Sequence, residues 1–220
     1  MDSQKILLGS NDQGLGQVGG GARLPRLDLW PLTPDTQEPM TPLCTISERF
    51  LPINFIPAGM ALTVFITARQ HDGAFNRAVQ RHYTVNQQDD LDKTSNGYAR
   101  VILHTLAEQE LLPAVPPLLL ERRFIQFEPL SAQEEDQELA DEDSGLEVSK
   151  PLGRPSWLQD PIYEPPRYQF LMQLLDSDIA KASPAHEGLL ADGIGYLYVN
   201  RQARRGKEGD EAGFFFIQFT

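Results

Sequence analysis

The chain is poor in cysteine and lacks a long apolar segment. Cys44 is the single cysteine among 220 residues, which excludes an internal disulfide framework and fits a reducing compartment. The most apolar stretch, residues 111–120, contains three prolines and is about half as long as a membrane span. The first residues carry no basic segment followed by a long apolar one. We therefore expect no signal peptide, no membrane-spanning helix and a cytoplasmic location.

Positive charge is also scarce. The chain has 19 Lys and Arg against 31 Asp and Glu, which gives a formal net charge of −12. Ordinary nucleic-acid binding is not expected, because it needs a cationic surface that displaces counterions from phosphates. Many proteins are this acidic for solubility alone. The charge also fits a basic protein partner, since opposite fields steer association.

No local spacing predicts a metal site or a catalytic nucleophile. Cys44 has no second cysteine nearby, and no Gly-x-Ser-x-Gly motif is present. The four histidines are scattered without metal-ligand spacing; they are His71, His82, His104 and His186. We expect a buried, inert thiol at Cys44, no metal and no catalytic residue.

Residues Gly14–Gly19 match the Gly-x-Gly-x-x-Gly pattern of dinucleotide-binding proteins. That pattern works only where a helix begins within it. Pro25 and Trp30-Pro31 follow closely, and prolines at these positions oppose such a helix. We interpret the segment as a flexible glycine loop and expect no cofactor.

A pattern of turn, strand, glycine and second strand occurs twice. The first copy runs from Trp30-Pro31 through residues 41–43 to Gly59 and the apolar residues 60–66. The second runs from Trp157 through residues 168–174 to Gly193 and residues 194–199. With 17 prolines and 17 glycines, the chain favours short strands and turns. We predict an α+β fold that is β-rich and internally pseudo-duplicated, with two similar half-units and one clear helix between them.

The predicted organisation is a single domain over residues 1–220. It divides into a first half-repeat (22–67), a helix-containing insertion (68–130), an acidic linker (131–149) and a second half-repeat (150–220). The clear helix is expected from Thr94 or Ser95 to about Leu111, stopped by Pro113. Strands are expected at 81–85 and 122–127, and the apolar segment 214–219 is expected as a strand buried centrally in a sheet.

The acidic stretch between the half-repeats has almost nothing apolar to bury. It is either a solvated linker or weak helix, or an anionic surface that blocks a basic cleft in a partner. In the second case the partner-binding residues are Glu134, Glu135, Asp136, Glu138, Asp141, Glu142 and Asp143. Trp30 and Trp157 are either apolar anchors of that interface or packed turn residues.

Asp176-Ser177-Asp178 follows an apolar strand. Two carboxylates one residue apart can contribute to a metal site if further ligands come from elsewhere. They can equally end a strand by accepting free backbone N–H groups in a turn or cap. The corresponding functional alternative is a metal-dependent or hydrolytic enzyme that uses Asp176, Asp178 and Asp192 with a histidine.

The second half-repeat contains Gly153-Arg154-Pro155-Ser156-Trp157-Leu158-Gln159, a strand end up to Asp176-Ser177-Asp178, and Asp192-Gly193 before a strand. In these motifs it resembles the YwqG-like family. The segments around Gly20–Pro25, Trp30-Pro31 and Pro57-Ala58-Gly59 are similar to its first half. Ala22 and Arg23 stand where that family tends to have proline, and Leu190-Ala191 replaces its Trp-Gly.

The resemblance implies a β-rich α+β scaffold with internal duplication and no established catalytic mechanism. Bacterial members occur as immunity-type proteins beside secreted toxins. The leading hypothesis is therefore an immunity-type binding protein that occludes a cognate toxin. A nuclease is the most natural toxin with a basic cleft. A metal-dependent or hydrolytic enzyme and a general adaptor protein are the alternatives.

Overall fold

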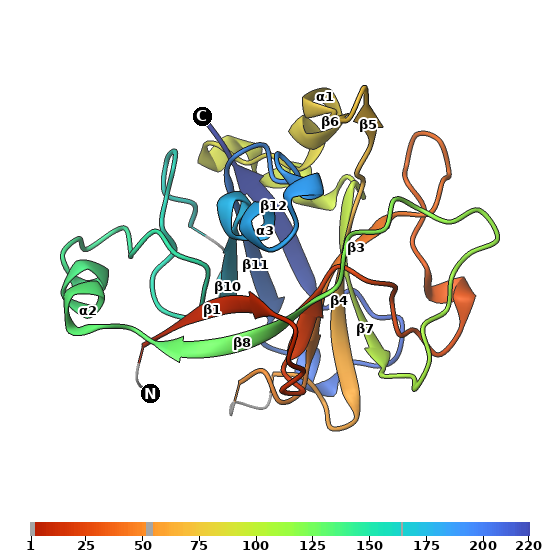
Figure 1. Cartoon of the computed structure of the whole chain (residues 1–220), viewed down its shortest axis with the longest axis horizontal. Coiled ribbons are helices and arrows are strands. Elements are labelled where there is room, and N and C mark those ends of the chain that lie inside the picture. Colours follow the sequence, from red (N-terminus) through yellow and green to blue (C-terminus); the bar gives the residue numbers. More distant parts are fainter. Residues whose placement is uncertain (1–2, 52–54, 164) are drawn as a thin grey trace.

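The computed structural model describes residues 3–51, 55–163 and 165–220 (Figure 1). Most of its regular structure is antiparallel β-sheet, so the expected β-rich α+β class is confirmed. The larger sheet contains, in spatial order, β1 (Gln4–Gly9), β8 (Arg123–Pro129), β2 (Gly16–Val18), β3 (Thr41–Ser47), β4 (Met60–Ile66) and β7 (Ala99–Thr105). The smaller sheet contains β12 (Gly213–Gln218), β11 (Ile194–Asn200), β10 (Tyr168–Leu175) and β9 (Lys150–Pro151).

Short elements connect and cover the sheets. The α-helices are α1 (Arg77–Gln80), α2 (Ala132–Leu139) and α3 (Asp176–Ala182), and β5 (Gln70–His71) pairs with β6 (Ala74–Phe75). The 3-10 turns are η1 (Leu27–Leu29), η2 (Arg81–Tyr83), η3 (Gln88–Ser95), η4 (Pro184–His186) and η5 (Ala203–Arg205). Of the helices in the described ranges, none has the length and apolar character that crossing a membrane requires.

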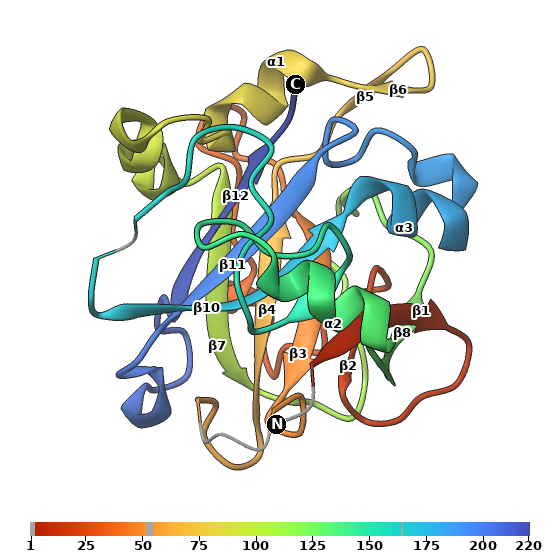
Figure 2. The same cartoon turned by 90° about the vertical axis from the view of Figure 1, so that its left-hand side faces the viewer.

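The two sheets lie face to face and meet at both edges (Figure 2). At one edge the Ala212 N–H donates to the Val101 carbonyl over 2.9 Å, which joins the chain before β12 to β7. At the other edge the Ile6 N–H of β1 donates to the Ser149 carbonyl over 2.7 Å, next to β9. These contacts satisfy backbone groups that would otherwise be exposed at the edges of the two sheets.

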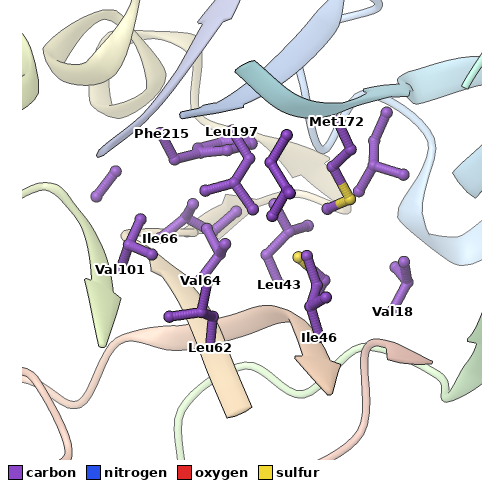
Figure 3. Close-up of a cluster of buried hydrophobic side chains, with 14 of the residues drawn as sticks. Val18, Leu43, Ile46, Leu62, Val64, Ile66, Val101, Met172, Leu197 and Phe215 are labelled. Atoms are coloured by element: carbon purple, nitrogen blue, oxygen red, sulfur yellow. The ribbon is translucent and has the colours of Figure 1, made fainter. Parts of the chain in front are cut away.

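The main core fills the space between the sheets (Figure 3). Val64 and Ile66 of β4 lie opposite Leu197 of β11 and Phe215 of β12, all fully buried. Burying one side chain of this size stabilises the fold by about 1.5–3 kcal/mol. The outer face of the larger sheet buries a second cluster around Trp30, and that of the smaller sheet buries an aromatic layer that includes Tyr196, Tyr198, Phe214 and Phe216.

The prediction of a helix from about residue 94 to 111 is wrong. Residues 88–95 form η3, and Ala99–Thr105 form β7, which pairs antiparallel with β4. Val101 and Leu103 face the core between the sheets, whereas Ile102 faces the cluster around Trp30. A strand buried on both faces loses the alternation of apolar and polar residues, so its sequence can imitate helical spacing.

Two expected strands differ in type or position. Residues 81–83 form η2 after α1 rather than a strand, and only Thr84 and Val85 pair with β12. The apolar strand at the C-terminus is buried as expected, but β12 is the outer strand of its sheet. Val85 covers its free side by donating an N–H to the Ile217 carbonyl over 3.0 Å. The strand expected at 122–127 is confirmed as β8.

The segment 131–149, expected as an acidic linker or weak helix, contains α2. Ser131 begins the helix with a capping box: its hydroxyl accepts the Glu134 N–H, and the Glu134 carboxylate accepts the Ser131 N–H. This arrangement satisfies two N–H groups that a helix start otherwise leaves free. The acidic stretch thus has a defined conformation, and α2 lies on the outer side of the smaller sheet (Figure 2).

Candidate functional site

The acidic residues of the segment 131–149 divide into structural and exposed ones. Glu134 is structural: besides capping α2, it accepts a hydrogen bond from the Lys5 ammonium over 2.9 Å. The Lys5 hydrogen bond, followed by those from Ser131, lowers the pKa of the Glu134 carboxyl to about 2. Glu134 therefore joins α2 to β1, and its negative charge is already paired with the Lys5 ammonium.

Glu138 points inward from α2 and is buried. Its carboxylate forms an ion pair with Lys150 of β9, with side chains only 8% and 2% exposed. One oxygen also accepts the Leu146 N–H over 2.6 Å, and the other accepts the Arg154 N–H over 3.1 Å. The prediction that Glu138 contacts a partner is wrong, because a carboxylate with these contacts is not available at the surface.

Asp141 organises the turn that follows α2. Its Oδ1 atom accepts the N–H groups of Asp143 and Ser144 over 2.7 and 3.1 Å. These two hydrogen bonds lower the pKa of the Asp141 carboxyl. The Arg154 guanidinium donates to the Asp141 carbonyl. Asp141 thus stabilises the turn, although the residue itself is exposed.

Four of the seven predicted acidic residues remain exposed without a side-chain ion pair or hydrogen bond in the part of the chain that the structure describes. We call Glu135, Asp136, Glu142 and Asp143 the acidic surface. Leu139 lies within it at 68% exposure and was not found from the sequence. Exposed apolar side chains with a polar rim mark protein-binding surfaces.

The acidic surface borders a cleft of about 420 Å³, which we call the aromatic cleft. Its walls include Glu142, Asp143, Pro155, Trp157, Pro161 and Tyr163. The Trp157 ring is half-buried and stacks on Tyr196 with a centroid distance of 5.1 Å. The Ser144 hydroxyl accepts the Trp157 N–H over 3.1 Å, which joins the turn after α2 to the segment that carries Trp157.

Tyr163 is the most exposed aromatic residue of the cleft, at 69%. Its main chain is held on both sides by one amide: Gln88 accepts the Tyr163 N–H over 2.8 Å and donates to the Tyr163 carbonyl over 3.1 Å. The ring is therefore presented on a fixed backbone. The sequence offered no signal for this residue, because the contact joins positions 75 apart.

Trp30 does not belong to this surface. It is 5% exposed and packs edge-on against Phe65 at a centroid distance of 5.4 Å. Its indole N–H donates to the Met40 carbonyl over 2.9 Å. Of the two possible anchors, Trp30 is thus a packed core residue, and only Trp157 reaches the acidic surface.

The three aspartates of the enzymatic alternative have separate structural contacts. Asp176, in the first turn of α3, is buried and accepts the N–H groups of Gly188 and Leu190 over 2.8 and 2.5 Å. Burial raises the pKa of its carboxyl. Asp178 accepts from Ser149 over 2.7 Å and from Lys181 over 3.0 Å. Asp192 forms an ion pair with Arg77.

These contacts favour the structural interpretation of Asp176-Ser177-Asp178. Carboxylates in the first turn of a helix also interact favourably with its dipole. Within residues 3–51, 55–163 and 165–220, no three side chains of His, Cys, Asp or Glu gather closely enough to hold a metal ion. Cys44 is a buried free thiol, as predicted, and burial raises its pKa to about 12.

The glycine loop contains the short strand β2 rather than the start of a helix. Two of the scattered histidines are buried: His104 accepts a hydrogen bond from Thr63, and His186 accepts the Glu121 N–H. No protein-family model matches the chain, and no curated protein is significantly similar to it. The site must therefore be interpreted from its own geometry.

Proposed function

We propose that this chain is an immunity-type binding protein that occludes a basic surface of a cognate bacterial toxin. The observation that carries the proposal is the acidic surface on a fixed support. Glu135 and Asp136 project from α2, and Glu142 and Asp143 from the adjoining turn, while Glu138 beneath them is tied to Lys150. A segment whose backbone is already ordered loses less conformational freedom on binding than a mobile one.

The net charge of −12 supports the same partner chemistry. An acidic surface accelerates encounter with a basic protein, and the effect weakens as salt screens the field. A nuclease is the toxin class we favour, because its substrate-binding cleft must attract phosphates. Occlusion requires an interface of about 1,600 Å² in total and no catalytic residue.

We also propose that the chain is internally duplicated and is a member of the YwqG-like family. Two similar strand orders support this: β2-β3-β4-β7 in the larger sheet and β9-β10-β11-β12 in the smaller one. The second strand of each series carries a register shift, between Pro42 and Cys44 in β3 and between Phe170 and Met172 in β10. In each half a tryptophan packs on the outer face of its sheet, Trp30 on Phe65 and Trp157 on Tyr196.

Co-expression with the product of the adjoining open reading frame tests the proposal. We expect the chain to rescue growth from that product and to co-purify with it. A variant with Glu135→Gln, Asp136→Asn, Glu142→Gln and Asp143→Asn should rescue less well. The matched control, Asp89→Asn, Asp92→Asn, Glu108→Gln and Glu187→Gln, removes the same charge from exposed residues elsewhere and should rescue normally. Rescue that is equal for both variants would contradict the assignment of the surface.

A further inference from the structure

The aromatic cleft has features that select one kind of segment from a binding partner. It combines two flat rings, Trp157 and Tyr163, with two prolines, Pro155 and Pro161, and an acidic rim. Grooves lined with aromatic side chains bind polyproline II segments, whose prolines pack against the rings. The nearby carboxylates Glu142 and Asp143 add attraction for a cation beside those prolines.

Backbone hydrogen bonding argues against an added β-strand at the same place. The N–H groups of Asp143, Ser144, Gly145 and Trp157, in and beside the cleft, already have acceptors in Asp141, Pro155 and Ser144. The Leu171 carbonyl on the neighbouring edge of β10 accepts the Leu152 N–H over 2.9 Å. An incoming strand would find few free partners, whereas a polyproline II segment needs no regular backbone hydrogen bonds.

Two arginines also line the cleft, and both are engaged. The Arg154 guanidinium donates to the Asp141 carbonyl, and Arg201 Nε donates to the Tyr168 carbonyl over 3.3 Å. Neither forms an ion pair with Glu142 or Asp143 among the described residues. Both guanidinium groups keep their positive charge, but they leave the two rim carboxylates unpaired, so these can still receive a cation from outside.

We infer that the aromatic cleft binds an extended, proline-containing segment that carries arginine or lysine, presented by the protein partner. The inference rests on the proposed function for the identity of the partner as a basic protein. It adds the conformation and composition of the bound segment. The Trp157 ring is preorganised by stacking on Tyr196, and the backbone that carries the Tyr163 ring is fixed by the two hydrogen bonds to Gln88.

Trp157 provides a direct probe, because Trp30 is the only other tryptophan and lies in a separate buried cluster. A Trp30→Phe variant leaves Trp157 as the sole tryptophan. Its fluorescence is titrated with a synthetic peptide of Pro-Pro-Arg repeats. Peptides of Pro-Pro-Glu repeats and of Gly-Ser-Arg repeats serve as controls for charge and for backbone conformation. The same titrations on the otherwise unchanged chain, followed by calorimetry, show whether Trp30→Phe itself alters binding.

We expect the Pro-Pro-Arg peptide to change the Trp157 emission saturably and to bind at least about tenfold more tightly than either control peptide, a difference of about 1.4 kcal/mol. Tyr163→Ser should weaken binding, and so should Glu142→Gln with Asp143→Asn. The pair Glu135→Gln with Asp136→Asn, on α2, should change it little. An unchanged emission, equal binding of the Gly-Ser-Arg peptide, or indifference to Tyr163→Ser would overturn the inference.

The outcome separates this inference from the proposed function. If the peptides fail but the chain still rescues growth from the adjoining product, the cleft inference is wrong and the immunity proposal stands. If the Pro-Pro-Arg peptide binds as expected but no rescue occurs, the cleft binds such segments in a protein of another role.

Discussion

Lys150 and Glu138 form an ion pair from which water is almost wholly excluded, with side chains 2% and 8% exposed. Burial lowers the pKa of Lys150, and the Glu138 carboxylate opposes that shift by stabilising the charged ammonium. Glu138 also accepts the N–H groups of Leu146 and Arg154. The pair therefore connects α2 with β9 and with the chain on both sides of β9. The acidic surface depends on this connection for its position.

Replacing Lys150 with methionine should lower the free energy of unfolding by about 3–5 kcal/mol, because it leaves a buried carboxylate without its counter-ion. Urea denaturation near pH 7 measures the change. The double variant Lys150→Met with Glu138→Gln should recover part of the loss, since the remaining amide is uncharged. A loss below about 1 kcal/mol in the single variant would mean that the pair behaves like an exposed one.

Stability should fall as the pH drops from about 7 to 5. Burial lowers the pKa of both His104 and His186 below the ordinary value of 6.5. Over that window the unfolded chain binds more protons than the folded one, so acid favours unfolding and the stabilisation is fully present only above the unfolded pKa. His104 Nδ1 lies 2.9 Å from the Thr105 carbonyl, which can only accept, so the neutral ring carries its proton there.

Urea denaturation across this pH range checks the prediction. The double variant His104→Gln with His186→Gln should show a shallower dependence on pH. A dependence identical to that of the unchanged chain would assign the acid sensitivity to other groups.

Cys44 should react very slowly with thiol reagents in the folded protein. The side chain is buried in β3, and burial raises the thiol pKa to about 12, so the reactive thiolate is scarce. Labelling with a chromogenic disulfide should follow unfolding and speed up in the Lys150→Met variant. Complete labelling of the folded chain at the rate of a free thiol would contradict the buried position.

Trp30 and Tyr163 should differ sharply when truncated. Trp30→Ala should cost about 3–5 kcal/mol, because it removes a packed ring from the outer cluster of the larger sheet. Tyr163→Ala should change stability by no more than about 0.5 kcal/mol, since the ring is 69% exposed. Thermal and urea unfolding measure both variants. Similar losses for the two would mean that Tyr163 is a structural residue rather than a binding one.

Local patterns predicted the parts of the fold that depend on local chemistry. The apolar segments around Cys44 and Phe215 are strands, and Asp176 and Asp178 begin a helix directly after a strand. The capping box of Ser131 and Glu134 was also present in the sequence and would have predicted α2. The spacing of Val101 and Ile102 favoured a helix although they lie in a strand, because both faces of β7 are buried.

The sorting of the acidic residues could not be predicted from the sequence. In the sequence, nothing distinguishes Glu138 from the other acidic residues of the stretch. Glu138 is buried because it pairs with Lys150, 12 residues further along the chain. Tyr163 likewise depends on Gln88, far away in the chain. Such contacts follow from the packing of separate elements, which no short pattern encodes.

The rate of association with the product of the adjoining open reading frame, which the proposal takes to be the toxin, tests the central claim most directly. Stopped-flow mixing at increasing salt compares the chain with the variant Glu135→Gln, Asp136→Asn, Glu142→Gln and Asp143→Asn, and with the matched variant Asp89→Asn, Asp92→Asn, Glu108→Gln and Glu187→Gln. We predict that the first variant associates about tenfold more slowly at low salt and loses most of its salt dependence, while the second retains both. Equal rates for the two variants, or a rate indifferent to salt in the unchanged chain, would contradict the account.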